Sequence, residues 1–197
     1  LDIRYKLELL DILKRMAKKK GITVLMSLHE IDLAQKCADK IVCVRGEEIM
    51  AYGTPEEVFH EETIEKLYDL DNGSYNPLSG SLELKKTEGE PEVFVISSGG
   101  NGTPIYRKLQ REGRPFAAGI LYTNDVDYQA ARVLASKIIT EEPFEEISDN
   151  TYKNAENMID RCQIVVDAGV HIGSCNHRMR NLLQYAQEKG KLKRDYL

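Results

Sequence analysis

The second half of this sequence alternates predicted strands with helical patterns, and this alternation strongly limits the fold. Four segments read as strands: 93–96, 116–122, 145–147 and 163–168. Segments of helical spacing follow them at 105–111, 126–138, 150–161 and 179–188. A helix that joins two strands in this way belongs to a crossover between parallel strands. The sequence therefore predicts an α/β fold for residues 92–197, a Rossmann-like three-layer domain built on a small parallel sheet.

A glycine-rich turn lies between the first of these strands and its helix. Its residues are Gly99, Gly100, Asn101, Gly102 and Thr103, and we expect Thr103 to cap the helix ahead of Pro104. Backbone N–H groups of such a turn can bind an anion together with the helix N-terminus. The G-x-G-x-x-G pattern is incomplete because Ile105 stands at the third small position. A ligand site and a purely structural turn both stay open, and no cofactor follows from the pattern.

Polar residues at the ends of the other predicted strands are candidates for the same site. Asn124 and Asp125 follow the second strand, and Asp167 lies in the fourth. Ligands bind at the carboxyl edge of a parallel sheet, where these strand ends meet. Asp125 has a structural alternative as the N-cap of the next helix.

One loop contains His171, Cys175 and His177, a spacing that zinc ligands can have. The loop supplies only three ligands, and no second shell of supporting groups is visible in the sequence. We therefore assign no metal to it.

Residues 71–91 separate the two halves. This range is rich in Gly, Ser, Asn, Pro and Glu, with one short apolar segment at 82–84 that suggests a strand. We expect three parts: a segment at 1–70, a linker at 71–91 and the Rossmann-like domain at 92–197.

The first part begins with an amphipathic helix over residues 3–20, in which apolar residues recur at helical spacing. An apolar run at 22–27 predicts a buried strand that ends close to His29, and a short helix follows at 31–38. Strands are expected at 41–44 and 49–52 around a tight turn. Thr54, Pro55 and Glu57 then form a capping box at the start of another helix.

Short motifs in this first part recur in the order found in one protein family. They are Leu1-Asp2, the run ending in Ser27-Leu28-His29, Asp32-Leu33-Ala34, Ala38-Asp39-Lys40-Ile41-Val42, Arg45-Gly46-Glu47-Glu48-Ile49 and Gly53-Thr54-Pro55-Glu56-Glu57-Val58. Residues 1–70 resemble the last third of an ABC-transporter ATP-binding subunit, most closely those of iron–siderophore, haem and cobalamin importers. The second half resembles an extra C-terminal domain found on some of these subunits.

The resemblance implies roles for two residues and an activity for the complete protein. Asp2 would be the aspartate of the D-loop, and His29 the switch histidine of the H-loop. An imidazole there can donate a hydrogen bond toward a γ-phosphate during phosphoryl transfer. The complete protein would use ATP and magnesium to import a metal chelate or corrinoid. Its partners would be permease subunits and a second ATPase subunit in a homodimer, at the cytoplasmic side of the membrane.

Several motifs of the family are missing from these 197 residues. There is no G-x-x-x-x-G-K-[ST] phosphate loop, no signature motif, no Q-loop and no strand ending in the Asp-Glu pair that binds magnesium. The sequence also begins inside a helical pattern without methionine, so we expect it to be part of a longer protein. This chain alone is not expected to bind a cofactor or hydrolyse ATP.

Composition excludes some other roles. The net charge of −5 argues against a nucleic-acid partner, and the four cysteines form no C-x-x-C pair. No apolar run reaches the length of a membrane span.

Two alternatives to the transport function stay open: a non-catalytic sensing or dimerisation module in the second half, and an enzyme acting there on a nucleotide-like ligand.

Overall fold

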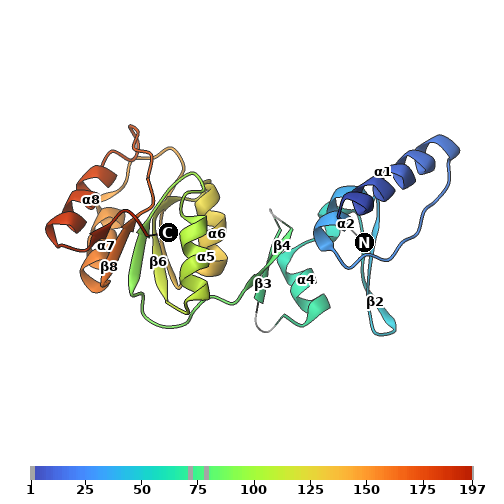
Figure 1. Cartoon of the computed structure of the whole chain (residues 1–197), viewed down its shortest axis with the longest axis horizontal. Coiled ribbons are helices and arrows are strands. Elements are labelled where there is room, and N and C mark those ends of the chain that lie inside the picture. Colours follow the sequence, from blue (N-terminus) through green and yellow to red (C-terminus); the bar gives the residue numbers. More distant parts are fainter. Residues whose placement is uncertain (1–2, 71–72, 78–79, 197) are drawn as a thin grey trace. The chain divides into compact units, whose positions relative to one another are not determined.

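The structure is a computed structural model that describes residues 3–70, 73–77 and 80–196 (Figure 1). The chain divides into two compact units. The first comes from Leu1–Asp71 and Tyr75–Leu82, and the second from Asn72–Ser74 and Glu83–Leu197. Each unit is described by itself.

The second unit is built on a five-stranded sheet in which every pairing is parallel. Its strands are β5 (Val93–Ile96), β6 (Phe116–Tyr122), β7 (Lys137–Glu141), β8 (Ile164–Asp167) and β9 (Leu192–Lys193). Their order across the sheet is β7-β6-β5-β8-β9. The chain therefore winds outward from β5 to β7, returns to β8 beside β5, and winds outward again on the other side. The predicted parallel α/β sheet is confirmed.

Helices cover both faces of this sheet, which makes three layers (Figure 1). α5 (Thr103–Arg111) and α6 (Val126–Leu134) lie on one face, and α7 (Asp149–Arg161) and α8 (Met179–Glu188) on the other. The four residues of β5 are fully buried, because side chains from both helical layers pack on them. Val93 and Val95 belong to the α5–α6 core, whereas Phe94 and Ile96 belong to the α7–α8 core.

The third strand of this sheet differs from the prediction. The predicted strand at 145–147 is wrong, and so is the continuation of the second helix to residue 138, because α6 ends at Leu134 and β7 follows. The β-branched residues Ile138 and Thr140 pair with β6 instead of extending the helix. Ile147 is buried because it packs into the α7–α8 core directly before Ser148, the N-cap of α7.

The first unit contains α1 (Ile3–Lys20), α2 (Ile31–Cys37), the antiparallel strands β1 (Ile41–Arg45) and β2 (Glu48–Gly53), α3 (Pro55–Val58) and α4 (Glu61–Tyr68). The predicted capping box is confirmed: the Thr54 hydroxyl accepts from the Glu57 N–H, and the Glu57 carboxylate accepts from the Thr54 N–H. β3 (Gly73–Asn76) and β4 (Ser81–Leu84) form a small two-stranded sheet.

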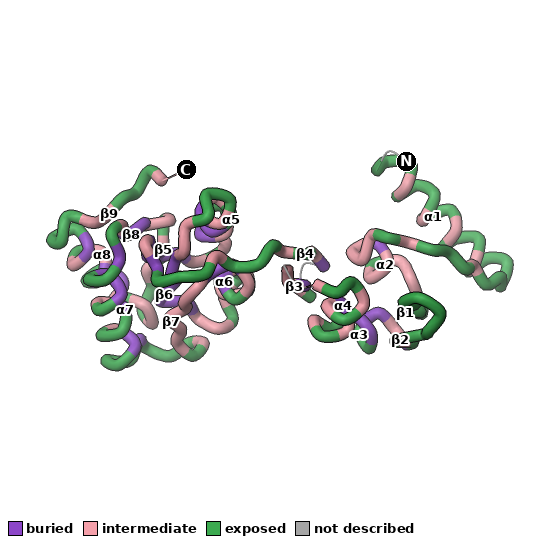
Figure 2. The backbone as a smooth tube through the Cα atoms, turned by 90° about the horizontal axis from the view of Figure 1, so that it is seen from below, coloured by how far each residue is buried: buried purple, intermediate pink, exposed green. Residues whose placement is uncertain are grey.

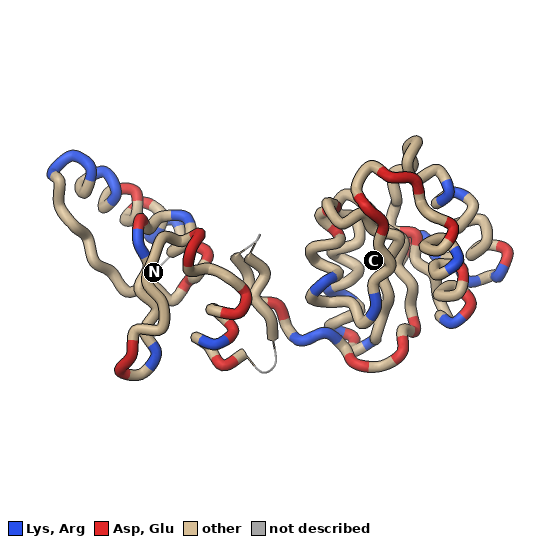
Figure 3. Tube along the Cα trace, turned by 180° about the vertical axis from the view of Figure 1, so that it is seen from behind, with Lys and Arg blue, Asp and Glu red and all other residues tan. Residues whose placement is uncertain are grey.

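The predicted buried strand at residues 22–27 is wrong. The structure has an irregular connection between α1 and α2 there, and Leu25 is 91% exposed. A strand needs a neighbour for its backbone hydrogen bonds, and no strand among the described residues pairs with this run. α1 likewise buries no residue, so its apolar stripe stays open, as the absence of purple on α1 in Figure 2 shows. Its lysine-rich end appears in blue in Figure 3.

Each unit has its own core with one buried cysteine. The core of the first unit consists of Cys43, Val58, Phe59, Ile64 and Tyr75. In the second unit, Cys162 lies in the α7–α8 core, where its Sγ donates to the Pro91 carbonyl over 3.4 Å. Cys37 and Cys175 are partly exposed, and no disulfide joins the cysteines.

Candidate functional site

His29 lies in the irregular connection before α2, with an exposed side chain. No hydrogen bond of its imidazole to another described residue is present, whereas the neighbouring Glu30 pairs with Lys6 of α1. That hydrogen bond lowers the pKa of the Glu30 carboxyl. Asp2, the other residue to which the family resemblance gives a role, lies outside the described residues. The structure therefore shows His29 accessible, with Glu30 as a charged neighbour.

The glycine-rich turn of the second unit connects β5 to α5 at the carboxyl edge of the sheet. Gly99 and Gly100 have φ angles of +66° and +94°, a region that side chains with a Cβ atom rarely adopt. Glycine at these positions lets the chain reverse directly after the buried strand. The N-cap of α5 is Gly102 rather than the predicted Thr103, which is the first residue of the helix.

A buried carboxylate occupies the N-terminus of α5. Asp127 is fully buried, and its Oδ2 accepts from the Gly102 N–H over 2.9 Å. Its Oδ1 accepts from the Thr103 N–H over 3.1 Å and from the Thr103 hydroxyl over 3.0 Å. A negative charge at this position is favoured by the helix dipole. The donors that an anionic ligand would need at the start of α5 therefore already bind a side chain of the protein.

Asp125 binds the backbone at the start of the same turn. The Gly99 N–H lies 3.0 Å and 3.1 Å from the two carboxylate oxygens of Asp125. Asp125 is also the N-cap of α6, where it accepts from the Asp127 N–H over 2.8 Å. Two carboxylates from the start of α6 thus hold the glycine-rich turn in place. A phosphate group would have to displace them, so this turn does not fit a nucleotide phosphate.

A crevice lies beside this turn, bordered by α5, by the end of β8 and by the segment that follows β9. Open α/β sheets bind ligands at the carboxyl ends of their strands. The cavity has a volume of about 440 Å³ and is lined by Asn101, Ile105, Asp167, Ala168, Gly169, Arg194, Asp195 and Tyr196. Of the predicted site residues, Asn101 and Asp167 meet here, whereas Asn124 lies exposed after β6 and is not part of the lining.

The polar groups of the crevice are held in place by short contacts. Asn101 Nδ2 donates to the Gly169 carbonyl over 3.0 Å, and the Gly169 N–H donates to Asp167 Oδ1 over the same distance. Arg194 Nε lies 3.5 Å from Asp167 Oδ2, and the Asp167 side chain is 13% exposed. A carboxylate, a guanidinium and an amide therefore face one hollow, which suits a small polar ligand.

The apolar wall of the crevice comes from Ile105 of α5 and from Tyr196. Tyr196 is fixed by α5 and the segment that follows it: Lys108 Nζ donates to the Tyr196 carbonyl over 2.6 Å, and Arg114 Nη1 to its hydroxyl over 2.5 Å. Lys108 also lies over the tyrosine ring, 5.0 Å from its centroid.

Sequence reasoning missed three residues of this region: Asp127, Arg194 and Tyr196. Asp127 had a signal, because two aspartates at positions 125 and 127 flank the start of a helix directly after a buried strand. The residues near the end of the chain carry no pattern that links them to β8.

The side chains of Cys175 and His177 contact backbone carbonyl groups rather than a shared metal site. His177 Nδ1 lies 2.8 Å from the Ser174 carbonyl oxygen, and Cys175 Sγ donates to the Phe144 carbonyl over 3.4 Å. Within residues 3–70, 73–77 and 80–196, no group of three or more His, Cys, Asp or Glu side chains is arranged to hold a metal ion.

No described helix is both long and apolar enough to span a bilayer. The residues present also do not fit Mg-ATP, because the sequence contains no phosphate loop and the N-terminus of α5 is taken by Asp127.

Comparison with protein families matches residues 116–193 to the MJ0874 family. The chain is 35% identical over 122 residues to the uncharacterised ABC transporter ATP-binding protein MJ0873 of Methanocaldococcus jannaschii, which covers 61% of this chain and 42% of that protein. It is 24% identical over 162 residues to the cobalamin import ATP-binding protein BtuD of Halobacterium salinarum, and this match covers 79% of the chain and 41% of that protein. It is 34% identical over 71 residues to the achromobactin transport ATP-binding protein CbrD of Dickeya dadantii, and this match covers 36% of the chain and 26% of that protein.

The homologues of this chain are ABC transporter ATP-binding proteins, which confirms the resemblance found in the sequence motifs. They include ATP-binding subunits of importers for cobalamin, siderophores and haem. The chain spans about two fifths of the length of the first two relatives. No solved structure matches it significantly.

Proposed function

We propose that this chain is the C-terminal part of an ATP-binding subunit of an ABC importer, which couples ATP hydrolysis to uptake of a metal chelate or corrinoid. The match to the cobalamin import protein BtuD carries this proposal, because it covers 79% of the chain. Residues 1–91 make up less than half of the chain, so this match includes part of residues 92–197 as well. Both halves therefore have counterparts in one ABC import protein.

In this proposal, residues 1–70 are the last segment of the nucleotide-binding domain, 71–91 the linker and 92–197 an accessory domain. ATP and magnesium bind to the complete protein, which works with permease subunits and a second ATPase subunit at the cytoplasmic face of the membrane. The exposed apolar stripe of α1 and the unpaired run at 22–27 support this assignment. Both features are typical of a segment that belongs to a larger core.

His29 is the proposed switch histidine and Asp2 the proposed D-loop aspartate. The imidazole is exposed and has no competing side-chain partner among the described residues. It is therefore free to turn toward a γ-phosphate that the rest of the complete protein would hold.

Replacing His29 by alanine in the complete protein is expected to lower ATP turnover by about 100-fold, because a donor to the transferring phosphate is lost. ATP binding is expected to change less than about threefold, since most binding groups lie elsewhere. Steady-state hydrolysis and equilibrium binding of ATP measure the two effects. His60→Ala, at an exposed histidine of the same unit, is the matched control and should change neither. An equal loss of binding and turnover for His29→Ala would contradict the switch role.

A second candidate function is small-molecule sensing by the accessory domain. The crevice beside α5 and the end of β8 favours it, because Asn101, Asp167 and Arg194 line one hollow beside an apolar wall. The occupied N-terminus of α5 favours a ligand without a phosphate group.

In calorimetry of this chain with adenosine, ATP and cyanocobalamin, adenosine, the one compound of the three without a phosphate group, is expected to bind at least as well as ATP. Asp167→Asn should weaken that binding about tenfold or more, because a charged hydrogen-bond partner is lost. Asp149→Asn is the control, since the Asp149 side chain is 98% exposed on α7. If Asp167→Asn leaves the affinity unchanged, the ligand binds elsewhere. If none of the three compounds binds, the sensing function loses its support and a docking role for this domain is left.

A further inference from the structure

The sheet of the second unit has two edges of different character. β9 is the edge strand on one side, and its two residues are too few to serve as a template for another strand. β7 closes the other edge with five residues, each of them partly exposed. Figure 2 shows β7 and β9 at opposite sides of the sheet. An edge strand of this length presents unpaired backbone N–H and C=O groups, and proteins usually protect such an edge.

β7 lacks two of the usual protections, a bulge and a proline, and its charged residues Lys137 and Glu141 stand only at its two ends. The register shift between β6 and β7 falls between the pairs Ala118–Ile138 and Leu121–Thr140. From one pair to the next, β6 advances by three residues and β7 by two. The extra residue therefore lies in β6, and β7 itself carries no bulge. It also contains no proline. Its backbone is regular enough to pair with a further strand.

The sequence of β7 is complementary to itself in the antiparallel direction. If two copies pair with Ile139 opposite Ile139, then Lys137 of each copy faces Glu141 of the other, and Ile138 faces Thr140. Opposite charges on directly facing residues stabilise a strand pair, and like charges destabilise it. A parallel pairing in register would bring like charges together, and it would not close by two-fold symmetry.

The side chains that would meet lie on one face of the sheet. Alternate residues of a strand point to the same face. Ile139 packs into the core on the α7 side, and the Glu141 carboxylate accepts from the Ser148 N–H at the start of α7 over 2.8 Å. Lys137 belongs to the same face by this alternation, and it borders a groove together with Ile139 and α7. Both predicted charge pairs would thus stand on the α7 face, flanking the two isoleucines.

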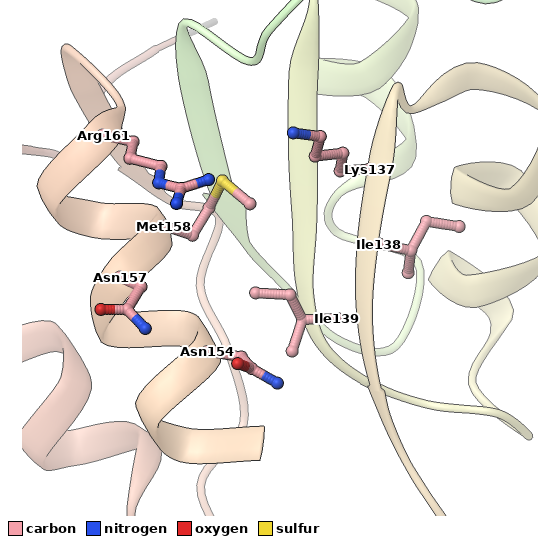
Figure 4. Close-up of a pocket in the computed structure, with 7 residues that line it drawn as sticks. All are labelled: Lys137, Ile138, Ile139, Asn154, Asn157, Met158 and Arg161. Carbon is pink, nitrogen blue, oxygen red and sulfur yellow. The ribbon is translucent and has the colours of Figure 1, made fainter. Parts of the chain in front are cut away.

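This groove offers room beside the edge. It has a volume of about 350 Å³, and Figure 4 shows Ile139 of β7 and Met158 of α7 among the residues that line it. Asn154 and Arg161 of α7 border it. Lys137 Nζ presently donates to Glu90 over 2.7 Å, yet the Glu90 side chain is 79% exposed, and such pairs contribute little stability. Lys137 can therefore exchange that partner for a carboxylate of a second copy.

We infer that β7 is a homodimer interface at which two copies of this chain pair antiparallel across Ile139, joining their sheets into one ten-stranded sheet. The inference rests on the length, regularity and charge order of this edge, and it is independent of the proposed transport function. The partner is a second copy because the two charges at the ends of β7 have opposite signs and are equally distant from Ile139.

Charge reversal tests this interface by sedimentation velocity of the full chain at about 100 µM, a concentration that detects even a weak dimer. The unmodified chain is expected to be dimeric. Lys137→Glu and Glu141→Lys should each weaken the dimer about tenfold or more, because each creates two like-charge contacts. An equal mixture of the two variants should form a heterodimer, since its facing charges are again opposite. Lys153→Glu, at an exposed lysine of α7 outside the groove, is the control and should leave the dimer unchanged.

Glu141 also supports the start of α7, so a second variant separates folding from pairing. Glu141→Gln keeps an oxygen acceptor for the Ser148 N–H but removes the charge, and it should weaken the dimer less than Glu141→Lys does. Circular dichroism checks that each variant is folded. A monomeric unmodified chain, a dimer that neither charge reversal weakens, or a mixture that fails to associate would each overturn the inference.

Discussion

Replacing Asp127 by alanine is expected to lower the free energy of unfolding of the second unit by about 3–5 kcal/mol. The substitution leaves the Gly102 N–H, the Thr103 N–H and the Thr103 hydroxyl without their acceptor. A buried donor without an acceptor costs about 1–3 kcal/mol. The variant also removes the negative charge from the N-terminus of α5, which the helix dipole favours.

Urea titration followed by circular dichroism measures this loss, and hydrogen exchange assigns it to the second unit. Asp195→Ala is the matched control, because Asp195 is exposed and should change the free energy of unfolding by less than about 0.5 kcal/mol. Asp127→Asn should fall between the two, since the amide keeps one oxygen acceptor but turns an N–H₂ group toward other donors. A loss below about 1 kcal/mol for Asp127→Ala would show that water replaces the carboxylate easily.

Gly102→Ala is expected to destabilise the second unit by about 2–3 kcal/mol, because the added methyl group has no room. An ideal Cβ at this position would lie 2.4 Å from Ser97 Oγ and 2.6 Å from both Cζ and the hydroxyl oxygen of Tyr106. Ser97 and Tyr106 are fully buried, and their hydroxyl oxygens lie 2.5 Å apart in a hydrogen bond. Neither side chain can move aside without breaking that bond.

The thermal midpoint and the urea midpoint of the full chain measure this effect. Gly173→Ala is the control, since its Cβ would meet its nearest neighbour, Asn176 Oδ1, only at 3.9 Å and its φ angle is not positive. Tyr106→Phe in the Gly102→Ala background removes one of the clashing atoms, so the two substitutions should be non-additive. Additive losses would mean that the cost of Gly102→Ala arises elsewhere in the turn.

Sequence patterns predicted those elements whose signals are local. The capping box at Thr54, the helix at residues 3–20 and the buried strand at 93–96 depend on spacing within a few residues, and the structure contains all three. The prediction of a buried strand at 22–27 was wrong because a strand also depends on a neighbouring strand. Spacing within a short stretch of sequence does not show whether such a neighbour is present. The predicted helix at 126–138 extends two residues into β7, because Ile138 continues the helical spacing of the preceding residues.

The candidate site was predictable in outline but not in its chemistry. Glycines after a buried strand indicated the turn correctly, and Asp167 was placed at the crevice by its position at a strand end. The sequence left open whether the turn binds an anion from outside. That question depends on Asp127, whose side chain reaches the turn from another helix, 24 residues away from Thr103. Contacts of this range do not appear in local spacing.

The two buried cysteines give each unit a chemical reporter of its own opening. Burial raises the pKa of the Cys43 thiol, and it raises that of the Cys162 thiol to about 11. Both thiols are therefore protonated and shielded at neutral pH, so an alkylating reagent reacts with them only after the surrounding core opens. Cys43 lies in the core of the first unit and Cys162 in that of the second. Labelling rates at these two sulfur atoms, read by mass spectrometry, thus separate the local stability of the two halves within one molecule.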